Sequence, residues 1–132
     1  MRKVTYGAAC SLDGFIARLN DGVDWLRWSD DVRRITASYW ERVDTVLMGR
    51  RTYEVARASG TGAYPSVSNF VFSRMLADDP EPGVQLVRGD AAAFVRQLKA
   101  SPGGEICVMG GGDLARTLFD ADLIDEVGAN VQ

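Results

Sequence analysis

Short apolar runs recur along the chain and are separated by polar or glycine-containing segments. Residues 4–10 form the first run, which is predicted to be a strand that ends before the turn signal Asp13-Gly14. Further runs of strand length lie at 45–48, 69–72, 84–87, 105–109 and 124–131. Unbroken runs such as 45–48 are typical of strands covered on both faces, which favours a buried parallel sheet.

Helical periodicity fills the intervals between these runs. The first helix is predicted from four apolar positions at helical spacing, Val32, Ile35, Tyr39 and Val43. Ser29 or Asp30 is its expected N-cap. Later helices are expected after Gly49, after the capping residue Asp90 and after the glycines at 110–112.

The alternation of strand and helix predicts an α/β fold, a three-layer α/β/α sandwich with a mostly parallel central sheet. Ligands of such folds usually bind at the carboxyl ends of the strands. The 132 residues, of which 46% are hydrophobic and 25% charged, fit a single domain spanning 1–132. The net charge of −3 argues against a nucleic-acid partner or an anionic membrane surface. No apolar run approaches the roughly 18 residues of a membrane span.

The sequence contains no histidine, which excludes Ser-His-Asp and Cys-His catalysis as well as histidine zinc sites. We expect no metal site. The two cysteines, Cys10 and Cys107, lie in predicted strands and have no CxxC partner. They are interpreted as buried, reduced thiols, which suits a cytoplasmic protein.

Three consecutive glycines, Gly110, Gly111 and Gly112, lie between a predicted strand and a predicted helix. Backbone N–H groups and the helix dipole at such a junction can hold a phosphate with no side chain in the way. A tight turn without a ligand would also use glycine there. Because one glycine would suffice for the turn, the run of three favours a phosphate site.

Basic and hydroxyl side chains follow two other strand ends. Arg50, Arg51 and Thr52 come after Gly49, and Ser73-Arg74 comes after the run at 69–72. If both ends meet at one rim of the sheet, these residues could clamp a phosphate monoester. Each residue taken alone could equally be a solvated charge at a helix start.

Four motifs occur in an order that resembles the dihydrofolate reductase-like superfamily, and more closely its branch containing the reductase domain of the bifunctional riboflavin-pathway deaminase-reductase. The motifs are SLDGFIA at 11–17, VLMGRRTYE at 46–54, NFVFSR at 69–74 and VMGGGDL at 108–114. Together they cover essentially the whole chain. The resemblance implies NADPH as the cofactor and a homodimer as the assembly.

In this superfamily the later motifs hold the cofactor. The arginine and threonine after the first glycine, with the Ser-Arg pair, would bind the 2′-phosphate side, and the triple glycine would bind the pyrophosphate. Residues of the first strand and its continuation would line the nicotinamide. The cofactor-binding set implied by the resemblance is Ala8, Ala9, Ile16, Gly49, Arg50, Arg51, Thr52, Ser73, Arg74, Gly110, Gly111, Gly112, Asp113 and Leu114.

The substrate carboxylate of the family lies near the start of the first helix, shortly after a tryptophan. Trp25 followed by Asp30 and Asp31 fits this arrangement, with Asp24 as a rival. Asp30 is the first choice for a catalytic residue, because it could hydrogen-bond an amino-heterocycle or relay a proton. It could instead only cap the helix.

These observations predict an NADPH-dependent reductase that transfers hydride to a small heterocyclic or ribosylamino-type substrate. A non-catalytic NADP-binding module is the alternative. The chain has no deaminase half, because it lacks histidine and paired cysteines. It also ends at Gln132, where the family continues into a C-terminal strand pair, so the run at 124–131 is expected either to pair with a second copy or to belong to a longer protein.

Overall fold

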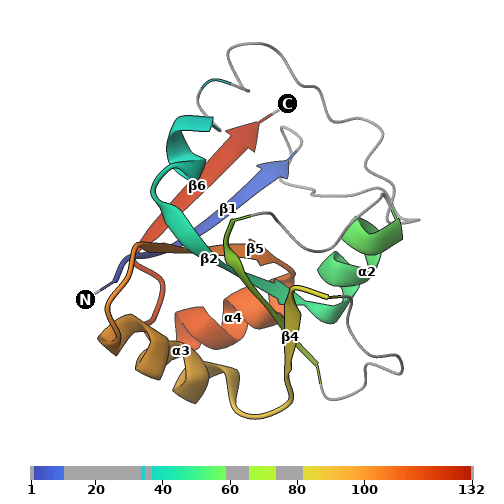
Figure 1. Cartoon of the computed structure of the whole chain (residues 1–132), viewed down its shortest axis with the longest axis vertical. Coiled ribbons are helices and arrows are strands. Elements are labelled where there is room, and N and C mark those ends of the chain that lie inside the picture. Colours follow the sequence, from blue (N-terminus) through green and yellow to red (C-terminus); the bar gives the residue numbers. More distant parts are fainter. Residues whose placement is uncertain (1, 11–33, 35–36, 59–65, 74–81, 132) are drawn as a thin grey trace.

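The computed structural model describes residues 2–10, 34, 37–58, 66–73 and 82–131, and shows a single six-stranded sheet (Figure 1). The strands lie in the order β4-β3-β2-β5-β1-β6, and every neighbouring pair is parallel. The strands are β1 (Val4–Cys10), β2 (Val43–Gly49), β3 (Ser68–Phe72), β4 (Val84–Val87), β5 (Glu105–Gly110) and β6 (Glu126–Val131). The helices described over their full length are α2 (Arg50–Ala58), α3 (Ala91–Ala100) and α4 (Gly112–Asp120), and part of a further helix before β2 is described up to Trp40.

Two apolar clusters cover opposite faces of the sheet. Alternate residues of β5 divide between them: Ile106 and Val108 belong to one cluster, and Cys107 belongs to the other. The first cluster includes residues of α3 and α4, which lie side by side in Figure 1. The second includes Tyr53 of α2, which is fully buried, and packs against Tyr39. The three-layer α/β/α prediction is confirmed.

Local sequence signals account for how two of the helices begin and pack. Asp90 caps α3 as predicted, with its Oδ1 accepting a hydrogen bond from the Ala93 amide at 3.2 Å. On α4 the buried residues are Leu114, Ala115 and Leu118, which share one face at helical spacing. Both helices thereby press an apolar stripe onto the same side of the sheet.

The helix before β2 ends earlier than its periodicity predicts, and the assignment of Val43 to that helix was wrong. The described helical residues stop at Trp40, and the Arg42 amide donates to the Tyr39 carbonyl at 3.1 Å in a closing turn. Val43 begins β2 and is only 6% exposed, packed in the cluster that also contains Met48. The next apolar position of the helix happened to coincide with the first buried position of the strand.

The structure also bears on the expectations for the two cysteines, the last strand and membrane-spanning segments. Cys107 is buried and free, as predicted, whereas the side chain of Cys10 lies outside the described residues. The last strand begins at Glu126 and not at Ile124: its ladder with β1 starts where Glu126 lies opposite Thr5, and the Asp125 amide donates to the Val4 carbonyl at 2.9 Å just before it. Among the described helices, none is long and apolar enough to cross a membrane.

Candidate functional site

Three predicted strand ends meet at the carboxyl edge of the sheet. In the parallel ladders Gly49 of β2 lies opposite Phe72 of β3, and Met48 lies opposite Gly110 of β5. Ser73 follows directly, and its amide donates to the Val87 carbonyl of β4 at 3.1 Å. The geometric part of the sequence prediction, that these segments share one rim, is therefore confirmed.

The backbones of β2 and β5 approach closely where this rim is formed. A Cβ atom at Gly49 would lie 3.2 Å from the Gly111 nitrogen. Gly110 has a φ of +124°, and a Cβ atom there would lie 3.3 Å from Oγ1 of Thr52. Gly111 would meet the same hydroxyl at 3.6 Å. Packing within the chain thus accounts for Gly49 and Gly110.

Gly112 differs from these neighbours. A Cβ atom at Gly112 would meet nothing within 4 Å, so no contact inside the described protein requires a glycine there. It is the first residue of α4, whose N-cap, Gly111, has no side chain that could cap the first amides of the helix. The first turn of α4 therefore offers backbone N–H groups beside open space, which is a cradle suited to an anion.

Two further predicted residues lie in this first turn of α4. The carboxylate-bearing Asp113 is exposed and already places a negative charge near the positive end of the helix dipole. Leu114 is only 7% exposed, and its side chain belongs to the core. Leu114 can therefore face a ligand through its backbone amide alone.

Helix α2 presents the opposite charge at its start. Its first turn contains Arg50, Arg51 and Thr52 and no acidic residue, so two guanidinium groups lie at the positive end of the helix dipole. Nη1 of Arg50 lies 3.2 Å and 3.3 Å from the two carboxylate oxygens of Glu54, one turn along the helix. The helix dipole disfavours cations at a helix N-terminus, and a phosphate bound there would offset that cost and meet the guanidinium groups, which makes this rim a candidate for phosphate binding.

The remaining predicted residues are only partly described. Ala8 and Ala9 lie on β1, opposite Ala129 and Asn130 of β6, near the carboxyl edge that holds the glycines. Their side chains, like the whole of Ile16, Arg74, Asp24, Asp30 and Asp31, lie outside the described residues. The substrate side of the predicted site therefore stays a prediction.

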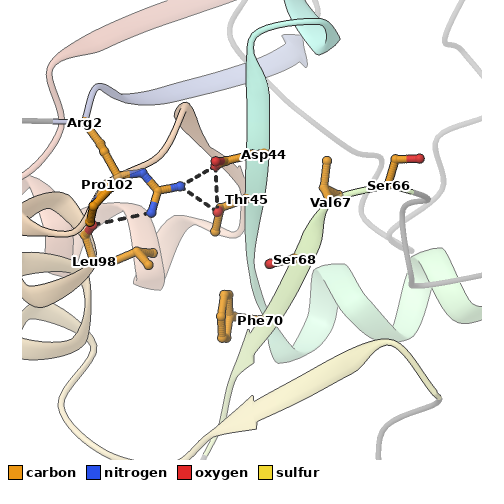
Figure 2. A pocket seen from close by; sticks show the side chains of 9 residues that line it. All are labelled: Arg2, Asp44, Thr45, Ser66, Val67, Ser68, Phe70, Leu98 and Pro102. Atoms are coloured by element: carbon orange, nitrogen blue, oxygen red, sulfur yellow. Dashed lines mark hydrogen bonds and ion pairs between the residues drawn. The ribbon is translucent and has the colours of Figure 1, made fainter.

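A cavity of about 500 Å³ opens at the opposite, amino end of the strands (Figure 2). Arg2 lies in its wall, and its side chain is 7% exposed. Nε donates to the Gly104 carbonyl at 3.0 Å, and Nη2 donates to Oγ1 of Thr45 at 2.8 Å and to the carboxylate of Asp44. The donors of Arg2 are used to join the chain start to β2 and the segment before β5. We interpret this cluster as structural.

The carboxyl group of Asp44 is ionised more readily than a free one. Burial would raise its pKa, but hydrogen bonds from the Gly104 amide at 2.7 Å and the Thr45 hydroxyl at 2.9 Å, with the charge of Arg2, hold the pKa below its usual value. This cluster could not be predicted from the sequence, because a single arginine at position 2 forms no pattern.

The described residues offer no activated nucleophile in the core. Burial raises the pKa of the Cys107 thiol and also raises the pKa of the Tyr39 hydroxyl. Both groups are therefore protonated at neutral pH, as expected for a buried structural thiol. Within the described part of the chain no cluster of three or more potential metal ligands is found.

Comparison with known proteins identifies the family to which this arrangement belongs. The family model of the RibD C-terminal domain matches residues 2–131. The chain belongs to the RibD C-terminal domain family. Two Bacillus subtilis (strain 168) proteins are similar to the chain. The uncharacterized protein YwjB is 31% identical over 127 residues (95% of this chain and 73% of YwjB), and the uncharacterized protein YyaP is 26% identical over 142 residues (95% and 71%).

Solved structures agree with this family and with the fold. A Shewanella sp. PV-4 protein named for riboflavin biosynthesis superposes with a TM-score of 0.78 at 29% identity, covering 95% of this chain and 73% of that one. Schistosoma mansoni dihydrofolate reductase superposes with a TM-score of 0.65 at 20% identity, covering 96% and 71%, and shares the fold. The resemblance drawn from the four motifs is confirmed: the family is reductase-like and the fold is that of dihydrofolate reductase.

Proposed function

We propose that this chain is an NADPH-dependent reductase that transfers hydride to a small heterocyclic or ribosylamino-type substrate. The observation that carries the proposal is the composition of the first turn of α2, which contains Arg50 and Arg51 and no acidic residue, at the same sheet edge as the open glycine Gly112. Membership of a reductase-like family supports the same reaction class.

The residues at this edge fit the phosphates of a dinucleotide. Arg50 and Thr52, with Ser73 and Arg74, are proposed to bind the 2′-phosphate, because guanidinium and hydroxyl groups make charge-assisted hydrogen bonds to phosphate oxygens. The glycine segment 110–112, together with the backbone amides of the first turn of α4 that begin at Gly112, is proposed to hold the pyrophosphate. Two helix N-termini would then act on two separate phosphate groups.

When bound, NADPH would supply the hydride for a C=N or C=O group. The chain would contribute orientation and proton handling. Ala8, Ala9 and Ile16 are proposed to line the nicotinamide with small or apolar side chains. Asp30, or else Asp31, is proposed to hydrogen-bond the substrate or relay the proton that accompanies reduction.

Calorimetric titration of NADPH and NADH tests the cofactor assignment. We expect about a ten- to hundredfold preference for NADPH, from charge-assisted contacts that contribute about 1.5–3 kcal/mol. Arg50→Ala should reduce this preference. Arg116→Ala is the matched control, because Arg116 also makes an i,i+4 ion pair, with Asp120, on an exposed helix surface. Equal affinities of the parent protein for the two dinucleotides would contradict the assignment.

Turnover is tested separately from binding. Oxidation of NADPH in the presence of a panel of heterocyclic and ribosylamino acceptors supports the reductase. Tight NADPH binding without oxidation by any acceptor favours the non-catalytic NADP-binding module instead.

A further inference from the structure

The guanidinium of Arg50, which is proposed to bind the 2′-phosphate, is already in contact with a carboxylate of the same helix. Nη1 of Arg50 lies 3.2 Å from Oε1 and 3.3 Å from Oε2 of Glu54, and the two side chains are 45% and 50% exposed. Among the described residues, Glu54 is the acid that contacts Arg50. We propose that Glu54 competes with the 2′-phosphate for Arg50 and so limits the preference for NADPH over NADH. This inference rests on the proposed function.

Helix stability does not explain the pair. An acid placed four residues before a base is the favourable order on a helix, and here the order is reversed, with Arg50 first and Glu54 second. Arg50 also lies at the end of α2 where the helix dipole disfavours a cation. The pair is exposed, and ion pairs of this kind contribute little to folding. The main effect of the pair is therefore electrostatic: it places a negative charge beside the Arg50 guanidinium.

A phosphate that binds Arg50 must approach the guanidinium that Glu54 already contacts. It either displaces the carboxylate or binds beside it. In both cases the phosphate dianion and the Glu54 carboxylate lie within the screening length of about 8–10 Å at physiological ionic strength. Glu54 therefore weakens binding of the 2′-phosphate, a group that NADH lacks.

The chain provides a matched control on another helix. Arg116 and Asp120 of α4 have the same i,i+4 spacing, with Nε and Oδ2 3.9 Å apart and side chains 84% and 75% exposed. Asp120 is the last residue of α4, at the end of the helix away from Gly112. Asp120→Asn thus removes one negative charge from the protein, as Glu54→Gln does, but away from the proposed phosphate site.

The test compares NADPH and NADH affinities by calorimetry at low salt in the parent, Glu54→Gln and Asp120→Asn. We expect Glu54→Gln to tighten NADPH binding about three- to tenfold and to leave NADH affinity unchanged, because the Arg50 guanidinium is then no longer shared with a carboxylate and NADH has no 2′-phosphate to bind it. Asp120→Asn should change neither affinity. In an Arg50→Gln background, Glu54→Gln should lose most of its effect, which shows that Glu54 acts through Arg50.

The outcomes separate this inference from the proposed function. If the parent prefers NADPH but Glu54→Gln leaves the NADPH-to-NADH affinity ratio unchanged, the inference is overturned and the proposed function stands. A fall in NADPH affinity also overturns it, because Glu54 would then hold Arg50 ready for the phosphate. A parent that binds neither dinucleotide, nor adenosine 2′-monophosphate as a probe of the phosphate site, overturns both.

Discussion

The Nζ atom of Lys99, on α3, lies 2.7 Å from Oδ2 of Asp125, the residue directly before β6. The same ammonium group donates to the Leu123 carbonyl at 3.3 Å, and its side chain is only 8% exposed. Oδ2 of Asp125 also accepts a hydrogen bond from the Val4 amide at 2.9 Å. One carboxylate therefore connects α3, β1 and the start of β6.

Asp125→Asn should lower the free energy of unfolding by about 1.5–3 kcal/mol, because it leaves the buried Lys99 ammonium without a charged partner. Urea denaturation measures this change. Asp120→Asn, at an exposed pair on α4, is the control and should leave the free energy almost unchanged. Equal effects of the two substitutions would show that the Lys99 contact adds nothing.

The same carboxylate makes stability depend on pH. Burial would raise the pKa of Asp125, but hydrogen bonds from Lys99 and the Val4 amide hold the pKa below its usual value. A lowered folded-state pKa contributes stability that is present above the unfolded-state pKa of about 3.9 and is lost as pH falls through the folded-state pKa. We expect the unfolding free energy of the parent to fall below about pH 4, and that of Asp125→Asn to fall less steeply. Parallel pH profiles would contradict this account.

Two glycines of the triple-glycine turn should respond differently to alanine. Gly110→Ala should destabilise the fold by about 1–3 kcal/mol, because Gly110 has a positive φ and lies against Thr52. Gly112→Ala should leave thermal stability unchanged or slightly raised, since alanine favours helices. It should nevertheless weaken NADPH binding about tenfold, because the added methyl group occupies the open space beside the Gly112 amide and keeps a phosphate from approaching it closely. Unchanged NADPH affinity in Gly112→Ala would place the pyrophosphate elsewhere.

Asp30→Asn is expected to spare NADPH affinity and to lower the rate of NADPH oxidation with a working substrate. Asparagine caps helices as well as aspartate does, so melting temperature should change little. Asp24→Asn and Asp31→Asn provide the comparison. If Asp30→Asn keeps full turnover, the role passes to whichever of these two variants loses it.

An apolar surface accompanies the edge strand of the described sheet. Val127 of β6 is 57% exposed and lies opposite Tyr6 in the ladder, and the Tyr6 ring packs edge-on against Phe119, which is 47% exposed. Exposed edges with apolar flanks favour pairing with another chain, so we expect a homodimer that buries this surface.

Light scattering should therefore show a dimer, and Val127→Lys should dissociate or aggregate it. Val55→Lys is the control, because Val55 is 40% exposed on α2 and far from β6 in the strand order. A monomeric parent that is indifferent to Val127→Lys would argue against the interface.

The strands could be predicted from the sequence because burial on both faces makes their residues nearly all apolar, as at Val46–Met48. Their order could not be predicted. β1 pairs with β5 and β6, which are remote in sequence, and no local pattern in 4–10 indicates either partner. The C-terminal end of the helix before β2 could not be predicted from the spacing of apolar residues either, because Val43 satisfies the helical spacing and the strand pattern equally well.

The location of the candidate site could be predicted because glycine ends β2 and begins α4, and parallel strands place their carboxyl ends at one edge. The partners of charged side chains were harder to foresee. The spacing of Arg50 and Glu54 was visible in the sequence, yet its meaning depends on the strand ends around it. The contact between Arg2 and Asp44 arises only when the folded sheet brings residues far apart in the chain together.

The strand order also bears on how the protein folds as it is synthesised. Val4 pairs with Ile106, about a hundred residues later, and the central strand β2 meets its neighbour β5 only after the intervening β3, β4 and α3 have been made. Contacts that close such long loops slow folding, because chain entropy must be lost before the ladder forms. In a ribosome-bound chain from which β5 has not yet emerged, β1 therefore has no strand to pair with. Until β5 emerges, the nascent protein is most prone to aggregate or to bind a chaperone.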